Sequence, residues 1–200
     1  MSTKGLRSIG EDIWKTKVDK VNAELVTLTY GSVVSQLCRD YEGNYSLVNK
    51  QLHKMGYNIG LRLIEDFLAK TTTSPAFSGP SGSRRCTNFK ETAEVISKVG
   101  FKMFLNITPA VENWTADGKQ FSLLLDENPL AEFVELPDDR AMRELWYSNI
   151  LAGVIKGALE MVQLEVDAFF VSDVLQGAPT TELRVRFVKV LEDEIPAGED

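Results

Sequence analysis

Cys86 is the residue whose surroundings most favour reactivity. It follows Arg84 and Arg85 and lies two residues before Asn88, which the pattern predicts as the N-cap of a helix. Two guanidinium groups and the positive end of a helix dipole favour the thiolate, the form that attacks an acyl thioester. A half-exposed loop thiol of no consequence is also compatible with this pattern. The residues therefore make Cys86 a candidate nucleophile or acyl carrier and leave these interpretations open.

A catalytic base for Cys86 would have to be His53, because His53 is the only histidine in the chain. It sits in the middle of a predicted helix among core positions, which favours a structural or merely exposed role. The sequence contains no phosphate-binding or dinucleotide-binding glycine motif and no Cys/His cluster with metal-ligand spacing. We therefore expect no catalytic residue and no metal. The alternative function is a thiol-dependent acyltransferase or thioesterase with Cys86 as nucleophile.

The negative charge of the chain is concentrated at its C-terminus. The formal net charge is -7, from 22 Lys plus Arg and 29 Asp plus Glu. Residues 191–200, LEDEIPAGED, hold five acidic residues and no basic one. The body is thus nearly neutral, and nucleic acid is not expected as a partner. An acidic terminus usually serves solubility, but the apolar interruption at 195–198 indicates a more specific contact.

Length and composition predict one domain with two irregular segments. Two hundred residues with 44% hydrophobic content fit a single globular domain, which we place at residues 22–200. Residues 1–21 have few apolar side chains and are predicted to be a mobile arm. Residues 71–84, rich in Thr, Ser, Gly and Pro, are predicted to be a flexible surface loop.

Hydrophobic spacing predicts four helices and two hairpins. Apolar residues recur every three or four positions over 25–41, 48–68, 89–104 and 140–161, and they alternate with polar ones over 164–170 and 183–187. The Asp-Gly pair at 117–118 supplies the turn of the other hairpin, between 111–115 and 121–125. Cys38 falls on the apolar side of the first helix and is predicted to be a small buried hydrophobe. The pattern indicates an α+β fold with an antiparallel sheet that helices cover on one face.

Two pairs of glycines lie four residues apart within predicted helices. Gly56 and Gly60 share one face of the second helix, and Gly153 and Gly157 share one face of the fourth. A helical glycine costs about 0.8 to 1 kcal/mol relative to alanine, so such a pair suggests that another backbone passes very close. We favour tight helix crossings inside the domain over a passage for a ligand.

Six blocks of the chain resemble the Bet-three class of TRAPP complex core subunits. These blocks are residues 26–42, 48–70, 85–109, 121–138, 147–166 and 191–200. The resemblance implies a four-stranded antiparallel sheet packed on one side against a helical layer, with an internal apolar tunnel. It also implies two-chain assembly through helices, with a homodimer for the isolated chain. The arm and the 71–84 loop look longer than is typical of the class.

The family resemblance further implies a role in vesicle traffic. Members are scaffold subunits of a vesicle-tethering complex that acts in endoplasmic reticulum to Golgi transport and exchanges nucleotide on a Rab-type GTPase. The implied partners are the other TRAPP small subunits and that GTPase. The implied location is the cytoplasm, peripherally at cis-Golgi and endoplasmic reticulum membranes, with membrane contact only through the complex. The chain alone would be non-catalytic.

The resemblance also assigns residues. In the motif R-C-x-x-F-[KR]-E-T, here RCTNFKET at 85–92, the cysteine carries a fatty acyl thioester. Cys86 would therefore hold palmitate, Arg85 would be the adjacent basic residue, and Gly100 would be the small residue that leaves the tunnel open. The family's tail touches the GTPase near its nucleotide. The matching residues here are Glu192, Asp193, Glu194, Ile195, Pro196, Ala197, Gly198 and Glu199.

Overall fold

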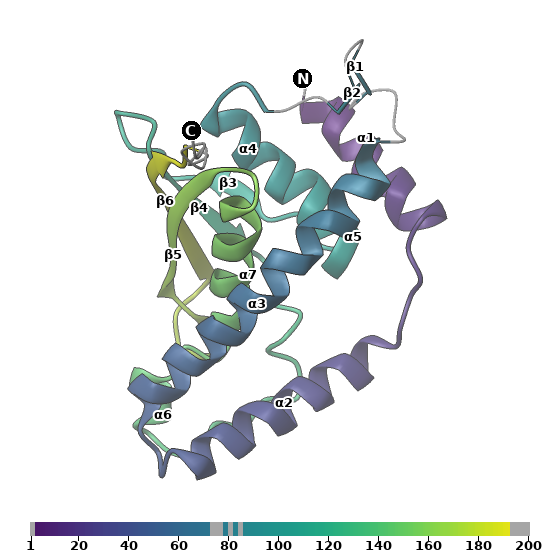
Figure 1. Ribbon diagram of the computed structural model, residues 1–200. Helices are drawn as coiled ribbons and strands as arrows, with labels where there is room; N and C mark the ends of the chain where they lie inside the picture. Colours follow the sequence, from purple (N-terminus) through teal and green to yellow (C-terminus); the bar gives the residue numbers. More distant parts are fainter. Residues whose placement is uncertain (1–2, 73–77, 80–81, 84–85, 193–200) are drawn as a thin grey trace, which may run out of the picture.

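A four-stranded antiparallel sheet carries the main core (Figure 1). The computed structural model describes residues 3–72, 78–79, 82–83 and 86–192. The strands are β3 (Ala110–Glu112), β4 (Gln120–Leu125), β5 (Leu164–Ser172) and β6 (Thr181–Val190), in the order β3-β4-β6-β5. Val185 of β6 faces Phe121 on one side and Ala168 on the other. The α+β fold and both hairpins are confirmed.

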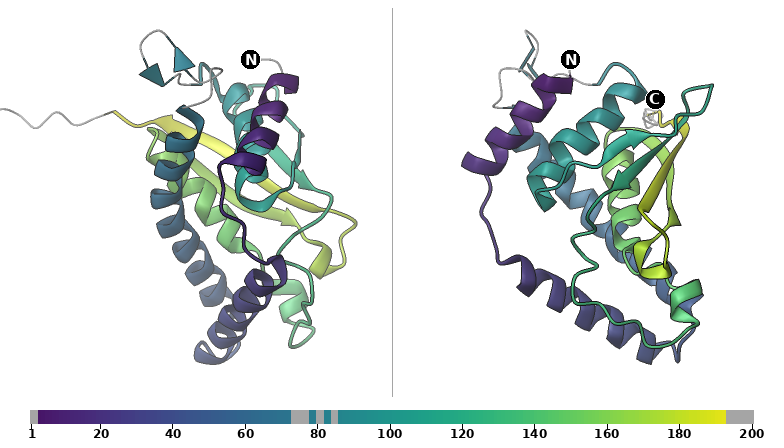
Figure 2. Two further views of the ribbon diagram at one scale, coloured as in Figure 1. Left: turned by 90° about the vertical axis from the view of Figure 1, so that its right-hand side faces the viewer. Right: turned by 180° about the vertical axis from the view of Figure 1, so that it is seen from behind.

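The two faces of the sheet differ as the alternation predicts. Val166 and Phe170 of β5 are buried under the helices, whereas Asp167 on the opposite face accepts a 2.7 Å hydrogen bond from Arg186 of β6. Two further ion pairs, Glu182 with Arg184 and Glu165 with Lys189, lie along the same strands. Helices α7 (Asn149–Glu160) and α3 (Tyr45–Thr72) lie side by side on the covered side (Figures 1 and 2).

The glycine pairs form the crossing between α3 and α7. A Cβ at Gly56 would lie 2.0 Å from the carbonyl oxygen of Ile150, and one at Gly153 would lie 2.0 Å from that of His53. Gly60 and Gly157 make equally close approaches one turn further along. No side chain fits at such distances, so the glycines allow the two backbones to touch. The prediction of a tight helix crossing is confirmed.

Helix α2 (Ala23–Asp40) is the least embedded of the long helices. It is held by Val34 in the core and by two hydrogen bonds, one from the Tyr30 hydroxyl to the Tyr147 carbonyl and one from Thr27 to the Pro129 carbonyl. Leu25 and Leu28 are 63% and 56% exposed. An apolar face of α2 is therefore left without cover from this chain.

Helix α1 (Thr3–Thr16) contradicts the prediction that residues 1–21 form a mobile arm. Leu6 and Ile13 are 1% and 0% exposed and pack with three buried residues of the 95–103 segment: Val95, Val99 and Met103. Leu6, Ile9 and Ile13 recur at the spacing of a short amphipathic helix. The many charged residues between them made the segment look like a solvated arm. The expectation that structure begins near Asn22 is wrong.

The remaining elements refine the sequence-based boundaries. The predicted third helix is continuous from α4 (Phe89–Val95) through a π-helical segment, η1 (Ile96–Phe101), to α5 (Lys102–Leu105). The predicted helix at 140–161 is divided into α6 (Ala141–Glu144) and α7. The break lies where the Trp146 amide donates to the Asn49 side chain. A short 3-10 turn, η2 (Val174–Gln176), joins β5 to β6.

The predicted loop at 71–84 is only partly described. Helix α3 continues to Thr72, and Thr71 is buried. The two-residue strands β1 (Ser78–Gly79) and β2 (Gly82–Ser83) pair antiparallel. Residues 73–77, 80–81 and 84–85 lie outside the described residues, so the predicted flexibility of the loop stays a prediction.

Candidate functional site

Cys86 is exposed and precedes α4 by three residues. The predicted cap forms: the Asn88 side chain accepts a 2.9 Å hydrogen bond from the Glu91 amide. The Glu91 carboxylate in turn accepts hydrogen bonds from the amide and the hydroxyl of Thr87. The hydrogen bond from the Thr87 amide lowers the pKa of the Glu91 carboxyl group. These contacts hold the chain on the C-terminal side of Cys86 in place, whereas Arg84 and Arg85 lie outside the described residues.

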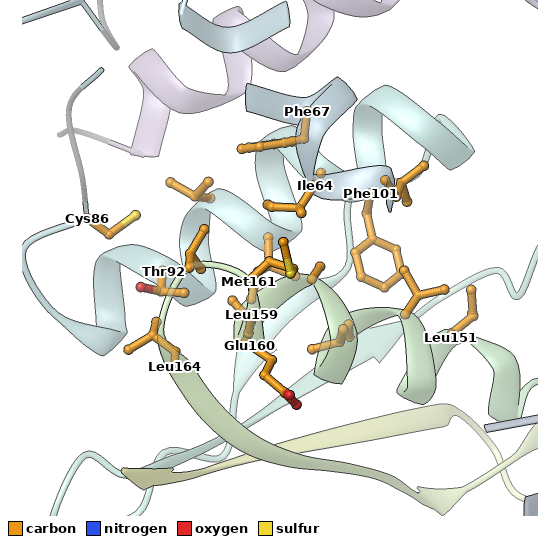
Figure 3. Close-up of a pocket in the computed structure, with 18 of the residues that line it drawn as sticks. Ile64, Phe67, Cys86, Thr92, Phe101, Leu151, Leu159, Glu160, Met161 and Leu164 are labelled. Atoms are coloured by element: carbon orange, nitrogen blue, oxygen red, sulfur yellow. The ribbon is translucent and has the colours of Figure 1, made fainter. Parts of the chain in front are cut away.

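A large apolar pocket begins beside Cys86, and we call it the Cys86 pocket (Figure 3). Its volume is about 1420 Å³, larger than the roughly 300 to 1,000 Å³ of most small-molecule sites. Its apolar walls come from α3, from the α4–η1–α5 segment and from α7. Representative lining residues are Leu63, Phe67, Ile96, Phe104, Leu151 and Leu159. Leu164, Phe187 and Val190 line it from the sheet.

Gly100 lines the Cys86 pocket from the π-helical segment η1. A Cβ at this position would meet its nearest neighbour, the carbonyl oxygen of Val95, only at 3.9 Å. This is an ordinary van der Waals distance, so Gly100 is not required by a close backbone approach. A larger side chain here would extend into the pocket. π-Helical turns inside α-helices are frequent at functional sites.

The lining of the Cys86 pocket includes a few polar residues, among them Thr92 and Glu160. The Glu160 carboxylate at the end of α7 accepts a 2.8 Å hydrogen bond from the Tyr57 hydroxyl of α3. This bond raises the pKa of Tyr57. Figure 3 shows the Glu160 carboxylate and the apolar Met161 and Leu159 contributed by the same stretch of chain. The interior is suited to a hydrocarbon rather than to a polar substrate.

His53 lies away from the Cys86 pocket. It is half-buried in a separate polar groove with Asn49, Lys50 and Trp146. Burial lowers its pKa, and the nearby Lys156 lowers it further. Cys38 is partly buried against the main core, where burial raises the pKa of its thiol. The geometry therefore places neither the sole histidine nor the second cysteine beside Cys86.

The acidic tail begins at a residue that lines the same pocket. The Leu191 amide donates a 2.9 Å hydrogen bond to the Gln163 carbonyl, and the Leu191 side chain lines the Cys86 pocket. Glu192 is exposed. The other predicted GTPase contacts, residues 193–199, lie outside the described residues. Their assignment stays a prediction.

Sequence reasoning missed most of the pocket lining. The apolar stripe over 48–68 has two different environments. Val48 and Leu52 are buried in the core, while Leu63 and Phe67 line the Cys86 pocket. In the described part of the chain, no group of three or more His, Cys, Asp or Glu residues could hold a metal ion. No described helix is long and apolar enough to cross a membrane.

Comparisons with known proteins agree on one family. Residues 26–186 match the family described as Transport protein particle (TRAPP) component. The chain is 57% identical over 198 residues to the trafficking protein particle complex subunit BET3 of Saccharomyces cerevisiae, covering 99% of this chain and 97% of the relative. It is 58% identical over 192 residues to the transport protein particle subunit bet3 of Schizosaccharomyces pombe, covering 96% and 97%. It therefore belongs to the TRAPP component family, and these relatives are subunits of the BET3 type.

A solved structure of a relative shares the fold. The crystal structure of a trafficking protein particle complex subunit 3 from Naegleria fowleri is 45% identical, with a TM-score of 0.77. The match covers 88% of this chain and 100% of that chain. That protein is covalently bound to palmitic acid. The family resemblance inferred from the six sequence blocks is confirmed.

Proposed function

We propose that this chain is an acylated scaffold subunit of a TRAPP complex, with palmitate in thioester linkage to Cys86. The observation that carries the proposal is the position of the Cys86 thiol at an apolar pocket of about 1420 Å³. The palmitate bound covalently to the Naegleria fowleri relative supports it. A hydrocarbon chain in the pocket would lie against leucine, isoleucine and phenylalanine side chains from three walls.

The acyl group would then act as part of the core rather than as a membrane anchor. Burying hydrocarbon contributes about 0.8 kcal/mol per methylene, so a C16 chain gains on the order of 10 kcal/mol before entropy costs. That gain would favour a chain folded into the pocket over one exposed to water. We expect a stable adduct, because withdrawal of the acyl chain from the pocket would transfer its hydrocarbon to water.

The rival function is a thiol-dependent acyltransferase or thioesterase with Cys86 as nucleophile. Such an enzyme needs a general base within hydrogen-bond reach of the thiol. His53, the only histidine, lines a different groove. The enzyme function also predicts a transient acyl-enzyme adduct that turns over. The scaffold function predicts a permanent acyl group on Cys86.

Intact mass spectrometry of protein made in a eukaryotic host separates the two functions. The wild type should carry one acyl mass that persists through purification, and Cys86→Ser should lack it. Cys38→Ser is the matched control and should keep it, because Cys38 lies against the main core. A wild type without the acyl mass would overturn the lipid proposal, and an adduct that decays with release of free acid would support the enzyme.

The exposed face of α2 supports assembly with a second chain. Leu25 and Leu28 leave apolar surface in water, which is typical of a protein interface. We place other TRAPP small subunits there within the complex, and a second copy in the isolated protein. Leu25→Asp should shift the isolated protein from dimer to monomer in analytical ultracentrifugation. An unchanged dimer would contradict this placement.

Within the complex we assign the acidic tail to the Rab-type GTPase. Carboxylates near the nucleotide would repel its phosphates and compete for Mg²⁺, which accelerates nucleotide release in endoplasmic reticulum to Golgi transport. Deletion of 193–200 spares Leu191, which lines the Cys86 pocket. That deletion should slow exchange by the assembled complex and leave assembly intact. An exchange rate equal to that of the wild type would reject the role.

A further inference from the structure

Helix α1 packs behind one wall of the Cys86 pocket. Val99 of η1 and Met103 of α5 are buried against Leu6 and Ile13 of α1. Gly100, the residue that follows Val99, lines the pocket. One short stretch of chain therefore contributes both to the pocket lining and to the contact with α1.

The contact between α1 and this wall is close and specific. A Cβ at Gly10 of α1 would lie 2.1 Å from the Lys98 carbonyl oxygen, so only glycine allows this approach. The Lys102 ammonium forms a 2.9 Å ion pair with Glu11, and the Lys102 side chain is only 13% exposed. The turn that α1 touches is π-helical, which is wider than an α-helical turn and has poorer intrinsic stability.

The same cluster also contacts the pocket wall formed by α3. Phe67 of α3 and Phe104 of α5 both line the Cys86 pocket, and both pack against the α1 cluster of Leu6, Ile13, Val95, Val99 and Met103. Just beyond α1, the Lys17 ammonium donates to the Lys70 carbonyl near the end of α3. The N-terminal segment thus bridges the two walls between which an acyl chain would lie.

We infer that α1 is a positioning element that holds the π-helical wall against the Cys86 pocket and so retains the acyl chain. The inference rests on the proposed acylation of Cys86. Without α1 docked, the wall at 96–101 would lose its backing and open more often. Cys86 is itself exposed, so its thioester carbonyl is shielded only while the acyl chain is held in the pocket. Each opening would let the chain withdraw and leave that carbonyl open to water and to nucleophiles.

The test measures how fast hydroxylamine removes the acyl group from the intact, full-length protein. Hydroxylamine nitrogen attacks the thioester carbonyl, the carbon–sulfur bond breaks, and the products are a hydroxamic acid and the protonated Cys86 thiol. Gly10→Ala should release the acyl group about tenfold faster than wild type by intact mass. Alanine is the better helix former, so a faster release would come from lost docking and not from unfolding of α1.

Two further variants complete the experiment. Ile13→Val removes one methylene from the cluster, should fold, and should give a smaller acceleration of about twofold. Ser8→Ala, on the exposed side of α1, should release at the wild-type rate. If wild type carries the acyl group and both Gly10→Ala and Ile13→Val release it at the wild-type rate, the inference is overturned. A wild type without the acyl mass would instead overturn the proposed function, and this inference with it.

Discussion

The crossing of α3 and α7 and the wall formed by α4, η1 and α5 both contain helical glycines, but the space beside those glycines differs. At Gly153 a Cβ would lie 2.0 Å from the carbonyl oxygen of His53 in the facing helix. At Gly100 the nearest atom to a Cβ would be 3.9 Å away, and it belongs to the same segment. In the first region the glycines allow two helices to come into backbone contact. In the second region the glycine leaves space beside the helix unfilled.

The distances at Gly153 and Gly100 show that helical glycines can have different structural roles. At the crossing the glycines are paired on both helices, so each helix receives the other's backbone. In the wall, Gly100 is single and faces the Cys86 pocket. Reciprocal pairs spaced by four residues therefore indicate a helix contact. A single helical glycine allows either a close contact, as at Gly10, or open space, as at Gly100.

The largest expected effect is at the crossing. Gly153→Ala should destabilise the fold by about 3 kcal/mol or more, because the new methyl group overlaps backbone that cannot move without separating α3 from α7. Chemical denaturation in a Cys86→Ser background measures this cost without any contribution from an acyl chain.

The matched control is Gly100→Ala in the same background. Its methyl group has room, and alanine is the better helix former by about 1 kcal/mol, so stability should be unchanged or slightly higher. Equal losses of stability at Gly153 and Gly100 would contradict the distinction between the two regions.

The second expected effect is on the acylated fraction of protein that retains Cys86. Gly100→Leu should lower the acylated fraction at least about tenfold, equivalent to about 1.4 kcal/mol, because the leucine side chain would occupy the space of the acyl chain. Gly100→Ala should retain most of the acyl mass. Intact mass spectrometry measures both fractions, and full acylation of the folded Gly100→Leu variant would show that Gly100 does not border the acyl chain.

The sequence predicted the elements whose signals are local or periodic. The alternation of 164–170 with 183–187, the Asn88 cap and the glycine pairs each depend on spacing that the chain shows directly. The predicted helix at 140–161 failed at 145–148 because its break depends on a hydrogen bond to Asn49, about a hundred residues away in the chain. A contact of that range leaves no periodic trace.

The candidate site was predicted in part for the same reason. The residues RCTNFKET single out Cys86, and the family resemblance points to Gly100. The pocket walls carry apolar stripes that are identical in pattern to core stripes, so Phe67 and Leu63 gave no sign of facing a cavity. The support from α1 was missed because three apolar residues among many charges resemble a solvated arm.

The smallest effect tests a polar contact where the two regions meet. The Tyr57 hydroxyl of α3 donates to Glu160 of α7. The Tyr57 backbone contacts Gly157 of the crossing, and Glu160 lines the Cys86 pocket. Tyr57→Phe should cost about 1 kcal/mol at pH 7, because the carboxylate loses a donor but can be solvated. Denaturation of wild type and variant at the same pH measures the difference.

The pH dependence of that difference identifies its origin. The bond to Glu160 raises the pKa of Tyr57 above its ordinary value of 10.0. Because the folded-state pKa of Tyr57 is raised, the hydrogen bond contributes fully to the free energy of unfolding below about pH 10. This contribution is lost as the pH rises through the folded-state pKa. The gap between wild type and Tyr57→Phe should therefore be constant from pH 7 to 9 and shrink above pH 10. If the difference in unfolding free energy stays unchanged at alkaline pH, the hydrogen bond is not its source. The loss of stability in Tyr57→Phe would then come from altered packing where α3 and α7 cross.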